Sequence, residues 1–351
     1  MSNEPGKSNI PNTPPSRKAR RKVLFVLTVD TEEEFDWNGG FPQHSCSVQN
    51  IQKIPKFQAF CESLNIRPTY LVDYPVATNQ NSALTLRTIA ATKKAEIGAH
   101  LHPWCTPPIE GENGEYESHV INLPPDLVRK KLKTLTAAIE DNIHVRPSVF
   151  RTGRWGTNAS VLAITMNEGY KVDSSIYPYY TNEYFSCDHA IGTPYWPSIE
   201  NPKKAGAQKS IFEIPVTAGF NRPNFPFWAK IHRLMSSKFA SPLRLVGFAW
   251  KTKALRKLYL SPELSSTSDM ITLTDAALAS EHPVIHMFIH SSSLLPGRNE
   301  FTQNREDEKK FYTRIESVVK HLAAQSDVTF CTLSEAQALL HQSCADHPSP
   351  R

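Results

Sequence analysis

The feature that most constrains the fold of this chain is a regular alternation of short apolar, β-branched segments with segments of helical length. The pattern predicts strands at residues 23–30, 67–72, 96–102, 148–155, 171–176, 211–216, 284–291 and 328–333. Strands that alternate with helices form βαβ units and pair in parallel. About eight such strands favour a closed or nearly closed barrel over an open doubly wound sheet. We therefore expect an α/β fold, a distorted (β/α) barrel of about seven to eight parallel strands.

The helices and the domain limits follow from the same pattern. Helices are expected at residues 48–64, 83–94, 125–142, 158–168, 269–280 and 304–324, with a short one after Ser334. Two long stretches, 177–210 and 218–268, interrupt the alternation, and long loops in a compact domain are often functional. The expected organisation is a disordered basic leader at 1–22, one barrel domain at 23–343 with an insertion at about 218–268, and a tail at 344–351.

The charge distribution separates the leader from the body. The 351 residues contain 39 Lys and Arg and 34 Asp and Glu, but residues 1–22 hold six of the basic residues and one acid, so the body is neutral. A nucleic-acid-binding protein would be expected to spread basic residues over its folded surface. We therefore expect no nucleic-acid partner. The leader is predicted to be a solvated tail, and the alternative is an arm for nucleic acid or a membrane surface.

Targeting and cofactor signals are few. The apolar run at 23–29 is too short for a secretory signal, and no stretch approaches the ~18 apolar residues of a membrane span. The six cysteines form no Cys-x-x-Cys pair, which favours reduced thiols over disulfides or a zinc knuckle. No Gly-x-Gly-x-x-Gly or Walker loop is present, which counts against nucleotide binding. A cytoplasmic protein is the default expectation.

Unusual polar residues stand at the ends of several predicted strands. In a (β/α) barrel these ends open on one face, where active sites are built. Residues i and i+2 of a strand point the same way, so a His-x-His pair can reach one divalent metal ion. The residues brought to this face are Asp30, Glu32, His100, His102, Arg151, Asp173 and His290.

Each of these features also has a structural explanation. A lone His-x-His is a weak signal, because partly buried histidines are common. The acids after the first strand could cap the next helix. Arg151 and Asp173 could form a structural ion pair, and His290 could be an ordinary barrel histidine. The occurrence of all of them at equivalent strand ends favours a catalytic site.

These residues and their order resemble a family, the polysaccharide deacetylases with NodB homology, or carbohydrate esterases of family 4. The resemblance covers roughly residues 23–340. The family's successive motifs are an Asp-Asp pair, a His-x-x-x-His metal pair, an Arg-Pro-Pro-Tyr-Gly type motif, an Asp motif and a Leu-x-His motif. The matching segments here are 28–32, 100–102, 150–156, 172–175 and 289–291.

Two motifs depart from the family pattern. Asp30-Thr31-Glu32 replaces adjacent aspartates, and His100-x-His102 shortens the spacing of the histidines. We expect Glu32 to be the carboxylate ligand and Asp30 the base, although the sequence leaves open which of the two binds the metal. If His102 is structural, the alternative ligands are His44 and Glu33.

The resemblance implies metal-assisted hydrolysis of a carbon–nitrogen bond other than a peptide bond. The substrate would be an N-acetyl or O-acetyl group on a sugar of a polysaccharide or glycan precursor. The expected cofactor is Zn²⁺, or another divalent metal such as Co²⁺, held by Glu32, His100 and His102.

The resemblance also implies roles for the remaining residues. Asp30 would act as base with Arg151 fixing it, and His290 would protonate the leaving group, oriented by Asp173. A backbone N–H near Arg154 or Trp155 would stabilise the oxyanion, with Trp104 among the substrate contacts.

Two other functions fit the same residues. One is a deacetylase-like carbohydrate-binding protein without activity, and the other is an amidase of a small cyclic amide on the same fold. The retained acid and base argue against the first. The sequence does not define the sugar, its linkage, its carrier or the oligomeric state.

Overall fold

A computed structural model describes residues 20–35, 39–44, 46–111, 113–237 and 244–346. Within it a parallel sheet runs in the order β10-β1-β2-β3-β4-β5-β6, and β9 pairs with β1 as well. The strands are β1 (Lys22–Thr31), β2 (Thr69–Val72), β3 (Glu96–Leu101), β4 (Val149–Thr152), β5 (Val172–Asp173), β6 (Phe212–Glu213), β9 (Val284–His290) and β10 (Asp327–Phe330). The predicted leader lies almost entirely outside the described residues, as does the end of the predicted tail.

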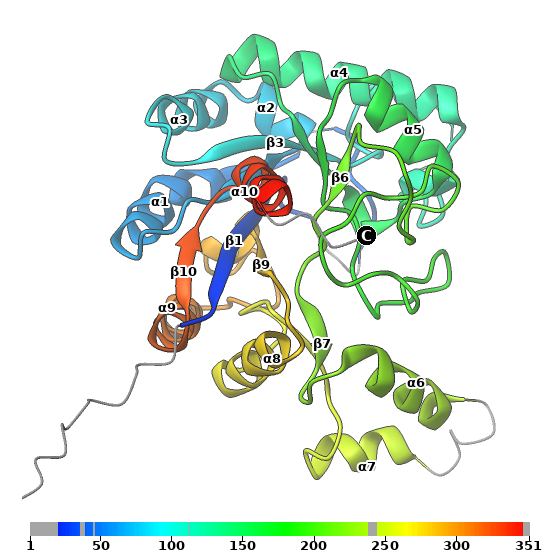
Figure 1. Cartoon of the computed structure of the whole chain (residues 1–351). Coiled ribbons are helices and arrows are strands. Elements are labelled where there is room, and N and C mark those ends of the chain that lie inside the picture. The colour runs from blue at the N-terminus through cyan, green and yellow to red at the C-terminus, as the bar shows by residue number, and fades with distance from the viewer. Residues whose placement is uncertain (1–19, 36–38, 45, 112, 238–243, 347–351) are drawn as a thin grey trace, which may run out of the picture.

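The sheet curls because β1 is long enough to take three partners. One edge of β1 pairs with β9, while the other edge pairs first with β10 and then, from Thr28 onward, with β2. All of these pairings are parallel. The segment after β6 returns to β9, where the amide of Thr217 donates to the carbonyl of His286 at 2.9 Å. The expected distorted (β/α) barrel is confirmed (Figure 1).

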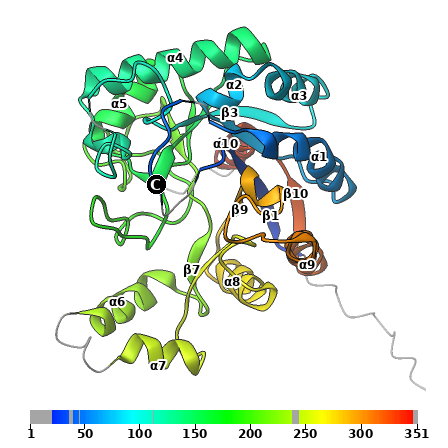
Figure 2. The same cartoon turned by 180° about the vertical axis from the view of Figure 1, so that it is seen from behind.

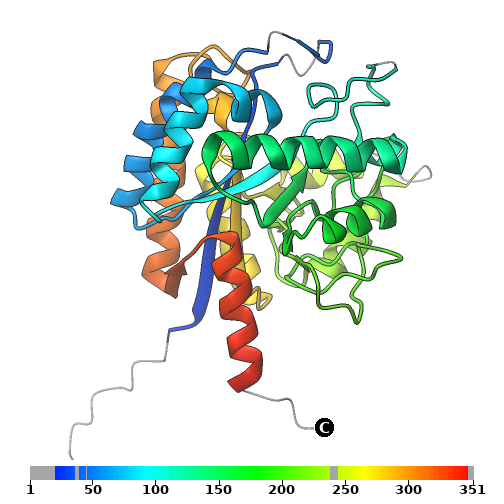
Figure 3. The ribbon, with the colours of Figure 1, turned by 90° about the horizontal axis from the view of Figure 1, so that it is seen from above.

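Helices surround this sheet (Figures 1 and 3). Most begin where an Asn, Asp or Ser side chain caps the first turn; Asn158, for example, accepts from the amide of Val161. The helix predicted at 48–64 is divided into a 3₁₀ turn, η1 (Gln49–Lys53), and α1, because Pro55 starts a new helix. The helices are α1 (Ile54–Ser63), α2 (Tyr74–Thr78), α3 (Gln80–Ala91), α4 (Pro125–Ile143), α5 (Ala159–Asn167), α8 (Thr267–Ala279), α9 (Arg305–Gln325) and α10 (Leu333–Asp346).

The C-terminal helix α10 closes one end of the barrel. Its residues Leu333 and Ala336 are buried in one apolar cluster with barrel side chains such as Val26 and Val149. Its first residues bond to the chain at the start of β2 and β3, where the amide of Leu333 donates to Thr69 Oγ1. The opposite end, where the strands finish, is left for polar side chains.

The stretch predicted as an insertion forms a small excursion from the barrel. An antiparallel pair, β7 (Ala218–Phe220) and β8 (Lys257–Tyr259), carries two helices between its strands, α6 (Phe225–Ser236) and α7 (Leu245–Lys251). Figure 2 shows both helices projecting away from the barrel. Among the described residues, no helix is both long and apolar enough to cross a membrane.

Candidate active site

Five of the seven polar residues predicted at the strand ends line one pocket of about 250 Å³; Arg151 and Asp173 do not. Because the pairings are parallel, the carboxyl ends of β1, β3 and β9 meet at the same end of the barrel. The pocket is lined by Asp30, Glu32, Phe35, His100, His102, His119, Arg154, Trp155, Tyr177, Tyr180, Asn182, Glu263, Leu264, Phe288, His290, Glu300 and Phe301. Seven of the ten predicted site residues therefore line one cavity: Asp30, Glu32, His100, His102, Arg154, Trp155 and His290.

Glu32, His100 and His102 form a compact set of metal-ligand atoms. Glu32 Oε2 lies 3.3 Å from Nε2 of His100 and 3.3 Å from Nε2 of His102, and all three residues are buried. Within the described part of the chain, neither carboxylate oxygen of Glu32 has a hydrogen-bond partner. Removing a carboxylate from water without a partner is costly. A cation between these donors would relieve that cost, so the residues fit a divalent metal.

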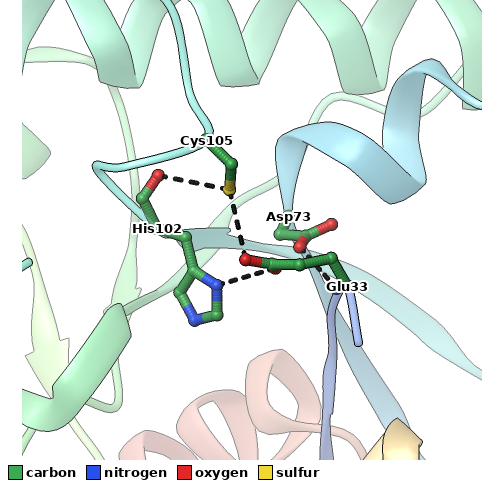
Figure 4. Close-up of side chains that lie close together, drawn as sticks. All are labelled: Glu33, Asp73, His102 and Cys105. Atoms are coloured by element: carbon green, nitrogen blue, oxygen red, sulfur yellow. Dashed lines mark hydrogen bonds and ion pairs between the residues drawn. The ribbon is translucent and has the colours of Figure 1, made fainter. Parts of the chain in front are cut away.

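A second layer holds His102 in place (Figure 4). Glu33 Oε2 lies 2.9 Å from His102 Nδ1, and Trp104 Nε1 donates to Glu33 Oε1 at 2.6 Å. The amide of Glu33 donates to Asp73 Oδ2 at 2.8 Å. A carboxylate on Nδ1 places the proton there and leaves the Nε2 lone pair for the pocket.

The Glu33 group is better explained as hydrogen-bonded support than as a second metal site. Glu33, Asp73, His102 and Cys105 are close enough together to hold an ion. However, both oxygens of Glu33 already accept hydrogen bonds, whereas those of Glu32 do not. Burial and the neighbouring carboxylate of Glu33 raise the pKa of Asp73 well above its usual value, which disfavours a second negative charge beside Glu33.

Asp30 is fixed by a buried ion pair. Arg151 Nη1 donates to Asp30 Oδ1 at 2.6 Å, and both side chains are buried. Arg151 is itself held by Ser174. Arg151 Nε donates to the carbonyl of Ser174, and Arg151 Nη2 donates to the hydroxyl of the same residue. Burial alone would raise the pKa of Asp30, but the charges of Arg151, His100 and His290, together with the hydrogen bond from Arg151, outweigh it and lower that pKa. Asp30 is therefore an ionised carboxylate whose Oδ2 lies 3.8 Å from His290 Nε2.

His290 is oriented by Glu263, a residue that the sequence analysis missed. Glu263 Oε2 lies 2.8 Å from His290 Nδ1, and Glu263 Oε1 accepts from the backbone amide of His290 at 2.8 Å. Burial lowers the pKa of His290, but the charges of Glu263, Glu32 and Asp30 and the hydrogen bond to Glu263 together more than compensate and raise it to about 10. The one available signal was that Glu263 is the first acid after Glu213.

The expected pairing of Asp173 with His290 is not found. Asp173 accepts a hydrogen bond from the hydroxyl of Ser175, which lies two residues further along the chain, just after β5, while Glu263 occupies the Nδ1 side of His290. Burial raises the pKa of Asp173 to about 6. The structure therefore places Asp173 outside the pocket lining and not beside His290.

Trp104 also departs from its expected place as a substrate contact. Its side chain is buried and is absent from the pocket lining. Instead the indole stacks on His102, with ring centroids 4.1 Å apart, and donates to Glu33. Trp104 thus supports the histidine from behind.

Arg154 and Trp155 line the pocket in an unusual backbone conformation. Their φ angles are 58° and 62°, and bulky residues adopt left-handed angles only when the surroundings enforce them. The preceding Gly153 is required by close packing, because a Cβ there would come within 2.4 Å of the His102 ring. This turn after β4 therefore brings backbone and His102 together at the pocket.

The remaining wall is aromatic and includes a histidine that the sequence analysis did not single out. Tyr177 packs on Trp155 and stacks on Tyr180, with centroids 4.8 and 5.0 Å apart. Both ring nitrogens of His119 lack hydrogen-bond partners among the described residues. Burial lowers the pKa of His119 to about 4, so its imidazole is neutral.

Solved structures with this fold include three with TM-scores above 0.5. A presumed polysaccharide deacetylase from Mycobacterium smegmatis has TM-score 0.54 and 17% identity, covering 95% of this chain and 96% of that one. A presumed glycoside hydrolase/deacetylase from Parabacteroides distasonis has TM-score 0.57 and 11% identity over 94% and 73%. PuuE allantoinase has TM-score 0.52 and 14% identity over 97% and 96%.

These similarities concern the fold of the barrel. No protein-family model and no curated protein matches the sequence. The chain has the fold of polysaccharide deacetylases with NodB homology, so the resemblance that its motifs indicated is confirmed at the level of the fold.

Proposed function

We propose that this chain is a metal-dependent hydrolase that removes acetyl groups from a sugar, with N-acetyl as the favoured substrate and O-acetyl as the variant. The observation that carries the proposal is the buried carboxylate of Glu32, unpartnered within the described residues and 3.3 Å from two imidazoles. An ionised Asp30 and a Glu263-bound His290 stand in the same pocket. The fold of the presumed deacetylases supports it.

The metal would be held by Glu32, His100 and His102, and Zn²⁺ or Co²⁺ suits one carboxylate and two imidazoles. When bound, such an ion polarises a carbonyl and lowers the pKa of water. Glu33 keeps the Nδ1 proton of His102 in place, so that Nε2 is the ligand atom.

The proton transfers are assigned to two side chains. Asp30, kept ionised by Arg151, takes a proton from the attacking water at Oδ2. His290 gives a proton from Nε2 to the leaving amine, or to the leaving oxygen of an ester, while Glu263 stabilises the imidazolium at Nδ1. The backbone turn at Arg154 and Trp155 is the proposed source of an oxyanion donor.

An amidase of a small cyclic amide is the second candidate. Two observations favour it, namely the whole-chain similarity to PuuE allantoinase and the modest pocket of about 250 Å³. The aromatic wall of Trp155, Tyr177 and Tyr180 favours a sugar ring, since flat aromatic faces pack on the apolar faces of sugars.

A substrate comparison separates these functions. The chain is loaded with Zn²⁺ or Co²⁺ and assayed for acetate release from N-acetylated oligosaccharides, nucleotide- or lipid-linked sugars and O-acetylated xylan, and for ring opening of allantoin. Acetate release that is lost with a chelator supports the proposal. Turnover of allantoin alone would favour the amidase. Metal content below about half an equivalent, without turnover, would favour a binding protein.

Glu263→Gln tests the orienting role with a pH profile. We expect kcat to fall and the alkaline limb of the pH–rate profile to move to lower pH. The charge of Glu263 contributes to the raised pKa of His290. Because His290 acts as an acid only when it is protonated, activity is lost as the pH rises through that pKa. Removing the charge lowers the pKa of His290, so the loss of activity begins at a lower pH. Glu316→Gln on exposed α9 is the matched control, and an unmoved limb would contradict the assignment.

Glu33→Gln tests the support of His102. We expect the affinity for Zn²⁺ to fall by about 10- to 100-fold, as for other second-layer partners of metal-bound histidines. Competition with a chromophoric chelator measures this directly. Unchanged affinity would mean that the hydrogen bond from His102 Nδ1 to Glu33 does not position the ligand.

A further inference from the structure

The helices of the insertion expose large apolar side chains. Phe227 and Leu234 on α6 are 48% and 68% exposed, and Phe248 and Trp250 on α7 are 68% and 43% exposed. A helix that faces water normally presents polar residues on its outer side. Figures 1 and 2 agree that α6 and α7 project from the barrel, so these side chains lie on an outlying part of the molecule. We call Phe227, Leu234, Leu245, Phe248 and Trp250 the exposed apolar set.

Internal packing does not account for this set. α6 already packs inward through Phe225 and Ala229, which are buried, and α7 does so through Ala249. Phe227 and Leu234 are seven residues apart, so they lie on the same stripe of α6, with exposed Lys230 between them. The two helices therefore have a second, unburied apolar surface that a partner would cover.

The charged side chains that this segment itself carries are of one sign. From residue 214 to residue 262 the sequence contains no Asp or Glu, although the body from residue 23 onward is neutral. The stretch from residue 214 to residue 262 has nine basic residues, which are Arg222, Lys230, Arg233, Lys238, Arg244, Lys251, Lys253, Arg256 and Lys257. Four of those with described placement, Lys230, Arg244, Lys251 and Lys253, are exposed on or beside α6 and α7.

Exposed aromatic and leucine side chains beside lysines and arginines fit an anionic lipid bilayer. The apolar side chains enter the boundary between headgroups and acyl chains, and the basic side chains meet the lipid phosphates. Nucleic acid would match the charge but leave the exposed apolar set in water. We infer that the α6–α7 surface docks on an anionic membrane surface.

The docking surface is connected to the pocket through the chain itself. β8 places Tyr259 against Tyr177, a pocket residue, with ring centroids 5.0 Å apart. Glu263, which holds His290, follows β8 directly in the sequence. The element proposed to bind the membrane is therefore continuous with one wall of the pocket. The docking does not depend on the proposed hydrolase chemistry.

Vesicle flotation of the full chain tests the inference. Vesicles of phosphatidylcholine alone are compared with vesicles that also contain phosphatidylglycerol. We expect binding to the anionic vesicles, weakened by high salt because charge attraction is screened. No binding to anionic vesicles would overturn the inference and leave a protein partner for this surface. Binding to a DNA duplex instead of vesicles would also overturn it.

Matched variants locate the binding. Two double variants should each weaken binding to anionic vesicles by about tenfold or more. One combines Lys230→Glu with Lys251→Glu, and the other combines Leu234→Ser with Phe248→Ser. Lys171→Glu with Lys309→Glu makes the same charge change on the barrel and should leave binding within about twofold. All four insertion positions are exposed, so thermal unfolding should be unchanged. Binding that survives both insertion variants would assign it to the basic leader and overturn the proposal.

Discussion

Asp30→Asn is expected to abolish acetate release while the metal stays bound. Loss of a general base lowers kcat by about 10²- to 10⁴-fold. Asp30 is not among the three ligand atoms grouped around Glu32, so its carboxylate can be neutralised without removing a ligand. Asn retains an oxygen that can accept the hydrogen bond of Arg151, which limits the cost of leaving a buried guanidinium uncompensated.

The measurement combines turnover with metal content on the same preparation. Asp126→Asn makes the same chemical change on an 85% exposed side chain and should keep both at wild-type values. Thermal unfolding of the Asp30 variant separates a catalytic loss from a folding loss. Undiminished turnover would remove the role assigned to Asp30, and simultaneous loss of metal would make Asp30 a ligand.

His102→Ala is expected to remove metal binding and, with it, activity. The variant deletes one of three ligand atoms, so its affinity should fall by more than the ~10- to 100-fold expected for Glu33→Gln. It also removes the hydrogen-bonding partner of Glu33 Oε2, which is buried, and leaves Glu33 only the bond from Trp104 at Oε1. We therefore expect a lower unfolding temperature in addition to metal loss.

The control is His321→Ala, which removes a histidine from α9 that pairs with Asp275 at the surface. It should bind one equivalent of Zn²⁺ with unchanged affinity. If His102→Ala retains stoichiometric zinc, His102 is structural and the ligand set is different. In that variant Oε2 of Glu33 no longer has the His102 imidazole beside it, so Glu33 is the first alternative ligand to test.

The similarity in fold bears on substrate choice only through the site. The proteins with similar structures include presumed deacetylases and PuuE allantoinase, so one barrel carries different chemistries. The residues that would discriminate substrates here are in the pocket wall, namely Trp155, Tyr177, Tyr180 and the neutral His119. Substrate profiling therefore decides more than any further comparison of folds.

Much of the barrel was predictable because its elements depend on local pattern. Strand β1 is buried along most of its length, and such strands have nearly continuous apolar sequences. Helix ends were less accurate, since caps such as Asn79, which starts α3 three residues before the predicted helix, depend on one side chain. Parallel pairing then placed the polar strand ends together.

The pairing of side chains within the site was less predictable. His290 was expected to pair with Asp173, which also stands at a strand end, but its partner Glu263 comes from the last part of the insertion, after β8. Loops of this length can place a residue at many positions around the barrel mouth, and no periodicity constrains them. Trp104 was expected among the substrate contacts and instead packs behind His102.

The sequence by itself determined the alternation of strands and helices, and therefore that Asp30, Glu32, His100, His102 and His290 share one end of a barrel. Only the tertiary structure decided which contacts each of the neighbouring acids makes. Glu32 and Glu33 are adjacent, yet Glu32 faces the two Nε2 atoms while Glu33 binds His102 Nδ1 from the other side. These orientations depend on how Trp104, Asp73 and Glu263 pack around the site. Their hydrogen bonds join parts of the chain that are distant in sequence, so no local pattern predicts them.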